Sequence, residues 1–209
     1  MKSSLPVRQI VLAATSLLAS GLHATQIVAD APDKVNPLTV GCQAPTHVVT
    51  GTDGLLDFGQ VIANKPTILV FYRANWCGLG NRALAELRDN SLTYEALGFQ
   101  IIAISADTPD SLKPAIEKNR LNYTVLSDRS LSLSSAYGIA FRASKELVST
   151  YARKGISLPS IPDLQGAEGL LVPTVFIVDR NGVIRWVYSD PKKNPTPHEL
   201  LAAAIKART

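Results

Sequence analysis

Runs of apolar residues alternate with segments of helical spacing along this 209-residue chain. The runs 67–73 and 99–105 are continuously apolar, which is typical of strands buried on both faces of a sheet. A third strand is expected over 123–126. Leucines between residues 80 and 94 recur near helical spacing and predict a helix there. Further helices are predicted over 110–120, 131–137, 143–153 and 198–207.

Turn residues predict two hairpins and one irregular segment. Asp53-Gly54 separates the runs 47–50 and 55–58, and Asn181-Gly182 separates 174–178 from 183–188. Such pairs favour the tight turns of β-hairpins. Prolines and glycines interrupt 156–171, which we interpret as a loop insertion. The order of elements predicts an α/β protein with a central mixed sheet, helices on both faces and an N-terminal hairpin extension.

The first residues have the layout of a cleavable signal. A short basic segment precedes the apolar run 10–22, which is shorter than the roughly 20 residues that span a bilayer. We expect a signal peptide over 1–24, with cleavage near Ala24 or alternatively after Gly21, and export to the periplasm. The alternative is a retained membrane anchor. A flexible lead-in is expected over 25–37, followed by one domain over 38–209.

Composition and charge exclude several classes of function. Hydrophobic residues make up 46% and charged residues 18%, which is enough apolar material for a folded core. The net charge is +4, and removal of Lys2 and Arg8 with the signal leaves 4 − 2 = +2, too little for a nucleic-acid footprint. The three histidines, His23, His47 and His198, are scattered, so no metal site and no cofactor are expected.

The candidate chemistry lies directly after the first buried strand. Cys77 stands where the strand turns into a helix, and the positive end of a helix favours a thiolate, the nucleophile of disulfide exchange and peroxide reduction. Arg73 could add positive potential. The alternative is an inert buried cysteine. Asp107 and Asp110 are interpreted as charges near a helix N-terminus rather than acid–base groups.

Five segments resemble one family. FYRANWCGLGNRALAEL is similar to the segment FYRGxWCPYCNxxLxxL of thioredoxin-fold proteins in the AhpC/TSA (peroxiredoxin-like) group. VGCQAPTHVVTGTDG resembles the opening of that group, IIAISADTPDSL and YTVLSD its central segments, and VPTVFIVDRNGVIRWVYSDP its last strands and hairpin. The resemblance covers about Leu38 to Pro191. It implies a thioredoxin-like fold and thiol redox activity.

The chain departs from the family pattern at the position of the second cysteine, which is Gly80. It therefore has neither a dithiol pair nor the Thr-x-x-Cys and facing arginine of peroxiredoxins. The resemblance implies that Val172–Pro173 is a cis bond and that Pro173 and Thr174 position the substrate. Trp76 shapes access to Cys77 or packs in the core, and both readings stay open.

Cys42 is the only other cysteine of the sequence. It either resolves an oxidised Cys77, within one chain or between two chains, or has no redox role. We expect an exported thiol oxidoreductase in which Cys77 exchanges with disulfides, or reduces hydroperoxides, with an external thiol as resolver. Its partners would be a protein or small thiol, a disulfide or a hydroperoxide. The alternative is a binding module that keeps the fold without turnover.

Overall fold

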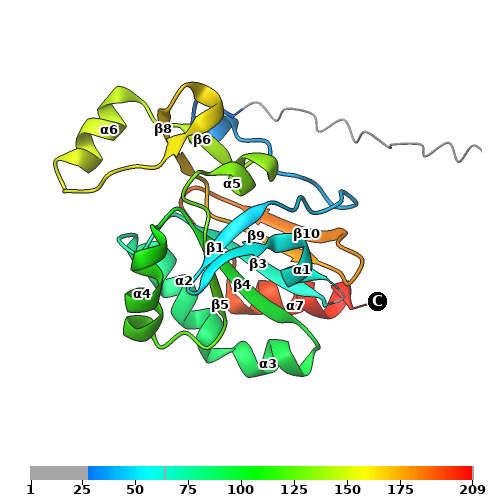
Figure 1. Cartoon of the computed structure of the whole chain (residues 1–209). Helices are drawn as coiled ribbons and strands as arrows, with labels where there is room; N and C mark the ends of the chain where they lie inside the picture. Colours follow the sequence, from blue (N-terminus) through cyan, green and yellow to red (C-terminus); the bar gives the residue numbers. More distant parts are fainter. Residues whose placement is uncertain (1–27, 64, 209) are drawn as a thin grey trace, which may run out of the picture.

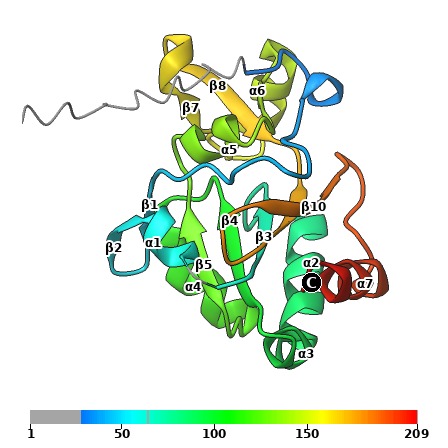
Figure 2. The same ribbon diagram turned by 90° about the vertical axis from the view of Figure 1, so that its right-hand side faces the viewer.

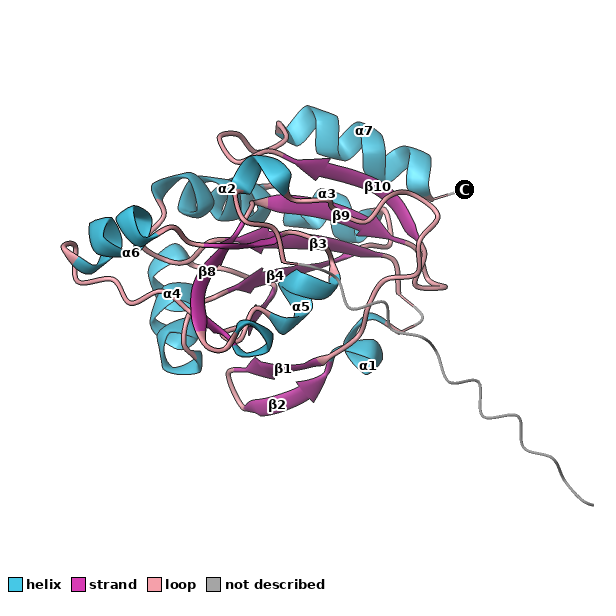
Figure 3. Cartoon of the chain, turned by 90° about the horizontal axis from the view of Figure 1, so that it is seen from above, coloured by secondary structure: helices cyan, strands magenta, loops and turns pink. Residues whose placement is uncertain are grey.

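The computed structural model describes residues 28–63 and 65–208 and contains a seven-stranded mixed sheet with strand order β10-β9-β3-β4-β5-β1-β2 (Figures 1 and 3). The strands of this sheet are β1 (Val48–Gly51), β2 (Gly54–Asp57), β3 (Thr67–Tyr72), β4 (Gln100–Ser105), β5 (Thr124–Ser127), β9 (Thr174–Val178) and β10 (Ile184–Ser189). The strands β3, β4 and β5 are parallel, and the others pair antiparallel. The expected mixed sheet and both hairpins are confirmed.

Helices cover both faces of this sheet because β3 and β4 are apolar on both sides. Leu69 and Phe71 point to the face covered by α1 (Phe58–Ile62) and α5 (Ser132–Ala136). Ile68 and Val70 point to the opposite face. That face is covered by α2 (Gly78–Asp89), α3 (Ser91–Ala96), α4 (Leu112–Asn119) and α7 (Pro197–Ala207). The helix expected over 80–94 is thus two helices, which meet at Asn90.

The segment expected to be a loop insertion forms a second, small sheet. Strands β6 (Ala140–Arg142), β8 (Ala167–Leu171) and β7 (Ser160–Ile161) pair in that order, and α6 (Lys145–Ala152) packs beside them. Two single-turn helices also occur, η2 (Pro109–Ser111) and η3 (Pro162–Leu164), besides η1 (Pro32–Lys34). Figure 1 shows α6, β6 and β8, and Figure 2 shows α6, β7 and β8, as a lobe beyond one end of the large sheet. We call residues 140–171 the lobe.

The N-terminal lead-in also differs from expectation, because residues 28–37 are not a free tail. The Ala29 amide donates to Ala140 O at 3.3 Å, and the Arg142 amide donates to Ala29 O at 2.7 Å. Ala29 and Val35 pack against the apolar cluster of the lobe. The expected signal peptide over 1–24 lies outside the described residues. Within the described residues no helix is long and apolar enough to cross a membrane.

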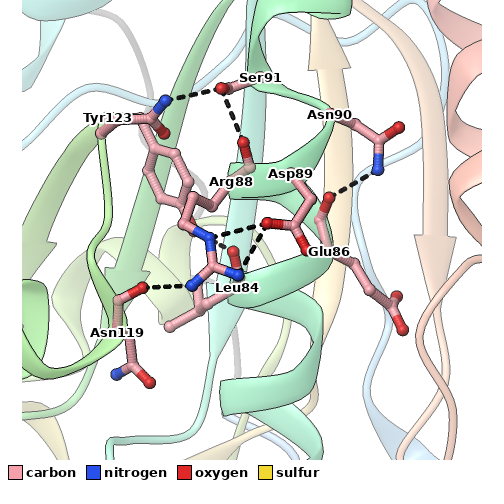
Figure 4. Close-up of polar contacts among 9 residues, drawn as sticks. Leu84, Glu86, Arg88, Asp89, Asn90, Ser91, Asn119 and Tyr123 are labelled. Carbon is pink, nitrogen blue, oxygen red and sulfur yellow. Dashed lines mark hydrogen bonds and ion pairs between the residues drawn. The ribbon is translucent and has the colours of Figure 1, made fainter.

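The C-terminal half of α2 is fixed by polar contacts to neighbouring elements (Figure 4). Arg88 donates to Asn119 O at 2.7 Å, which joins α2 to the end of α4. Tyr123 Oη donates to Leu84 O at 2.8 Å. Ser91 Oγ donates to Arg88 O at 2.8 Å at the turn into α3. These contacts hold the helix axis, and they therefore also fix where its N-terminus meets the sheet.

Candidate active site

Cys77 occupies the N-cap of α2, at the carboxyl end of β3. Its carbonyl accepts the Asn81 amide at 3.0 Å, and its own amide donates to Ala74 O at 3.0 Å. No side chain caps this helix end, so the first-turn amides lack a side-chain acceptor. The residue is 9% exposed, and its thiol is free. Cys77 therefore lies at a strand-to-helix turn, as predicted, and the positive end of the α2 dipole faces this residue.

Asn75 organises the turn that carries Cys77. Its carbonyl accepts the Asn81 side-chain amide at 2.7 Å, and its own side-chain amide donates to Ser111 O at 3.3 Å. Its backbone amide donates to Asp107 Oδ2 at 2.9 Å. The turn is thereby tied to α2, to the start of α4 and to the end of β4. Sequence reasoning gave Asn75 no role.

Asp107 is a buried carboxylate behind this turn, and its interpretation as a helix-end charge is wrong. It is 8% exposed, whereas Asp110 is exposed in η2. Besides the Asn75 amide, Asp107 Oδ2 accepts the Ser105 hydroxyl at 2.9 Å. Burial raises the pKa of the Asp107 carboxyl above its ordinary value, although both hydrogen bonds and the charge of Arg129 act in the opposite direction. The parallel pairing of β3 and β4 was the available signal, because it brings the ends of both strands to one edge.

Gly80, at the position of the family's second cysteine, is buried in the first turn of α2. A β-carbon placed there would lie 3.3 Å from Tyr72 Cδ2 and 3.5 Å from Tyr72 Cβ. The neighbouring ring would have to move by a few tenths of an ångström. A side chain at this position would therefore contact Tyr72.

The expected cis bond at Val172–Pro173 is wrong, since the described residues contain no cis peptide bond. A trans bond is the ordinary state of an X–Pro pair, and only the family resemblance suggested otherwise. Pro173 does lie at the end of β3 that leads to Cys77, because β9 begins at Thr174 opposite Phe71. Its carbonyl, however, accepts the Asp190 amide at 3.3 Å.

Thr174 does not face a substrate directly. It is 1% exposed, and its hydroxyl lies 2.9 Å from Ser189 Oγ and donates to Val172 O at 2.9 Å. The pair of hydroxyls joins the start of β9 to the end of β10. Thr174 therefore supports the backbone around Pro173, and its expected positioning of a substrate stays a prediction without a direct contact.

Arg73 and Trp76 flank the turn on two sides. Arg73 Nη2 donates to Pro191 O at 3.1 Å, so its guanidinium ties the turn to the loop after β10. Trp76 is 36% exposed and packs on Tyr151 of α6, with ring centroids 4.8 Å apart and planes at 53°. Trp76 therefore lies between the two open readings: it is at the surface, and it also packs. Tyr151 is a neighbour that only the folded lobe brings to the site.

Cys42 and Cys77 lie at opposite ends of the strands of the large sheet. Its carbonyl accepts the Ile184 amide at 2.9 Å, and Ile184 is opposite Val178, which is in turn opposite Thr67 at the start of β3. The length of β3 alone, at about 3.3 Å per residue, separates the two ends by roughly 17 Å. A disulfide needs Cα atoms within about 7 Å. Resolution of Cys77 by Cys42 of the same chain would therefore require refolding, and resolution between chains stays a prediction.

Comparison with known proteins places this geometry in a family context. The family model described as AhpC/TSA matches residues 40–187. The chain is 27% identical to chloroplastic peroxiredoxin Q of Suaeda salsa over 181 residues, which cover 87% of this chain and 72% of the relative. It is 34% identical over 106 residues to the Haemophilus influenzae protein named peroxiredoxin bcp, covering 50% of this chain and 68% of the relative.

A solved structure shows the same fold. The crystal structure of reduced Prx3 from Vibrio vulnificus in complex with hydrogen peroxide superimposes with a TM-score of 0.65 at 16% identity. The superposition covers 80% of this chain and 96% of that chain. At such an identity the likeness shows the fold, a peroxiredoxin-type member of the thioredoxin-like class. Within the described residues no group of three or more histidine, cysteine, aspartate or glutamate side chains is arranged to hold a metal ion.

Proposed function

The chain belongs to the AhpC/TSA family, and we propose that it is an exported thiol oxidoreductase in which Cys77 is the single attacking thiol. The observation that carries the proposal is the place of Cys77 as the N-cap of α2, on a turn held by Asn75 and Asp107. A helix N-terminus without a side-chain cap offers amide donors to an anionic sulfur. The match of the family model over 40–187 supports thiol redox chemistry at this place.

The proposed reaction with a hydroperoxide has three balanced steps. The Cys77 thiolate attacks the O–O bond, the sulfur becomes a sulfenic acid, and the alkoxide leaves and takes a proton as an alcohol. An external thiol then condenses with the sulfenic acid, forming a mixed disulfide and releasing water. A second external thiol attacks the mixed disulfide, which returns Cys77 to the thiol and releases the oxidised reductant. A disulfide substrate enters this sequence at the mixed disulfide.

The external thiol follows from the two positions that could have supplied an internal one. Gly80 has no sulfur, and Cys42 lies at the other end of the strands. The partners of the protein are therefore a hydroperoxide or disulfide and a separate thiol reductant. The competing proposal is a binding module, supported by the replacement of the second cysteine and by the low exposure of Cys77.

The test compares Cys77→Ser with Cys42→Ser. Hydrogen peroxide is added to each reduced protein in stopped-flow, the sulfenic acid is trapped with dimedone, and the site is located by mass spectrometry. The proposal expects peroxide or a model disulfide to modify Cys77 in wild type and in Cys42→Ser. It expects no modification at position 77 in Cys77→Ser. If neither peroxide nor a model disulfide modifies Cys77 faster than free cysteine reacts, the binding module replaces this proposal.

Export is the second part of the proposal and rests on the basic start and the apolar run 10–22. The intact mass of the protein recovered from a periplasmic extract tests it. Loss of residues 1–24, or of 1–21, supports export with cleavage. A full-length mass beginning at Met1 contradicts it.

A further inference from the structure

The loop between β10 and α7 runs beside α2 (Figure 2) and contacts its first turn. We call residues 190–195 the lysine loop. Its Asp190 amide donates to Pro173 O at 3.3 Å, and its Pro191 carbonyl accepts Arg73 Nη2 at 3.1 Å. Asn194 Nδ2 donates to Leu79 O at 3.1 Å, in the first turn of α2. Three contacts thus hold this loop to Arg73 and Leu79, which precede and follow Cys77 in the chain, and to Pro173 directly before β9.

Two cations of the lysine loop are free to meet a ligand. Lys192 and Lys193 are both exposed, and their backbone amides donate to Asp190 Oδ1 at 2.7 and 3.1 Å. The carboxylate of Asp190 is therefore engaged by the backbone. Among the described residues, ion pairs involve Arg88, Lys113 and Arg185, and neither of the two lysines takes part in one.

Other charged groups near Cys77 add to the positive side. Arg73 reaches the lysine loop from the turn itself, and Arg82 is exposed one turn into α2. The acids at this end include Asp190, buried Asp107 behind the turn, exposed Asp110 in η2, and Glu199, whose carboxylate caps α7 by accepting the Thr196 amide at 2.8 Å. Lys192, Lys193 and Arg82 are exposed, whereas Asp107 is buried and the carboxylates of Asp190 and Glu199 accept backbone amides.

From this arrangement, and resting on the proposed function, we propose that Lys192 and Lys193 select an anionic sulfur co-substrate, a thiol or disulfide with carboxylates near its sulfur. Exposed charges of one sign beside a reacting group raise the encounter rate with opposite charges, an effect that falls with ionic strength over a Debye length of about 10 Å at 0.1 M. Hydrogen peroxide is neutral, so this selection acts on the thiol or disulfide and not on peroxide.

The selected step is a simple exchange. The Cys77 thiolate attacks one sulfur of an anionic disulfide, the S–S bond breaks, a new bond joins Cys77 to that sulfur, and the other half leaves as a thiolate. The same cations then attract the anionic thiol that regenerates Cys77. A cationic or neutral thiol lacks this attraction and has to meet Cys77 by unassisted diffusion.

The experiment measures the reaction of Cys77 with three disulfides in a Cys42→Ser background. The probes are 5,5′-dithiobis(2-nitrobenzoate), which carries two carboxylates, neutral 2,2′-dithiodipyridine and cationic cystamine. The charge reversal Lys192→Glu with Lys193→Glu is compared with Lys65→Glu and Arg180→Glu. The control cations are exposed and flank Thr67 and Val178 at the opposite end of the strands, and the change in net charge is the same.

The proposal expects the lysine-loop reversal to slow the anionic probe by about tenfold at low salt, the lower end of electrostatic steering. It expects the neutral probe to change less than twofold, the cystamine reaction to accelerate, and the effect to shrink at 0.5 M salt. Equal effects in the lysine-loop and control variants, or no change with the anionic probe, overturn the inference. Failure of the neutral probe to react with Cys77 in the unreversed protein overturns the proposed function instead.

Discussion

A thiol placed at Gly80 tests the single-cysteine mechanism at the position where the family carries its second cysteine. The β-carbon of any new side chain would lie 3.3 Å from Tyr72 Cδ2, so the ring has to shift slightly. Crowding of this kind costs about 1 kcal/mol at the low end of overpacking, and replacing a helical glycine returns up to about 1 kcal/mol. We therefore expect the free energies of unfolding of Gly80→Cys and Gly80→Ala to lie within about 1 kcal/mol of the wild-type value.

Gly80→Ala is the matched control because it carries the same β-carbon without the sulfur. In Gly80→Cys the new thiol is three residues after Cys77 in the first turn of α2, so it can attack a mixed disulfide on Cys77. Well-oriented intramolecular groups reach effective molarities of about 10⁵ M or more. Even if the new thiol is far less well oriented, its effective concentration exceeds that of a millimolar external thiol. The adduct on Cys77 should therefore be released within a single turnover.

The assay counts thionitrobenzoate released by 5,5′-dithiobis(2-nitrobenzoate) in the Cys42→Ser background. The parent protein and Gly80→Ala should release one equivalent and retain the other as an adduct on Cys77, visible in the intact mass. Gly80→Cys should release two equivalents and retain none. Release of two equivalents by the parent protein would refute the reasoning, because it would mean that another group resolves Cys77. Retention of the adduct in a folded Gly80→Cys protein would refute the assumed geometry.

Three further predictions concern the supports of the site. Asp107→Ala removes the acceptor of two buried donors and should lower the free energy of unfolding in urea by about 1–3 kcal/mol, whereas Asp107→Asn keeps an acceptor oxygen and should lose less. Burial raises the pKa of Asp107, so the native state binds this proton more tightly than the unfolded state does. The contribution of Asp107 to stability is therefore present below about pH 4 and falls as the pH rises through the raised pKa. The difference in free energy of unfolding between Asp107→Asn and wild type should shift in favour of the variant from about pH 4 to 7, and a difference that does not change with pH would contradict the buried carboxylate. Tyr151→Ala should cost about 0.5–1.5 kcal/mol through the lost ring contact and shift the fluorescence of Trp76 to longer wavelength, and an unchanged spectrum would show that the two rings do not pack in solution.

The sequence predicts the large sheet well because its signals are local. Continuous apolar runs identify β3 and β4, and the pairs Asp53-Gly54 and Asn181-Gly182 identify the hairpins. The position of Cys77 follows from the same signals, since a strand directly before it and a helix directly after it leave little choice.

The lobe and the supports of the site could not be predicted because they depend on contacts between distant segments. The strand β7 has two residues and exists only through its pairing with β8, where Gly169 leaves room for Ile161 and for Phe141 O. Asp107 has the same local pattern as a helix-end charge, and only the fold brings the Asn75 amide onto it. The expected cis bond at Val172–Pro173 came only from the family resemblance, and the described residues contain no cis peptide bond.

The two cysteines at opposite ends of the strands give the molecule a direction. A disulfide from Cys77 of one copy to Cys42 of the next leaves the second copy's Cys77 and the first copy's Cys42 both unused, at the two outer ends. Such a head-to-tail link repeats without limit unless a rotation closes it into a ring or a reciprocal pair. Oxidation without an external thiol would then produce a ladder of covalent oligomers on a non-reducing gel. Either single cysteine-to-serine change would leave one thiol per chain, so no product larger than a dimer could form.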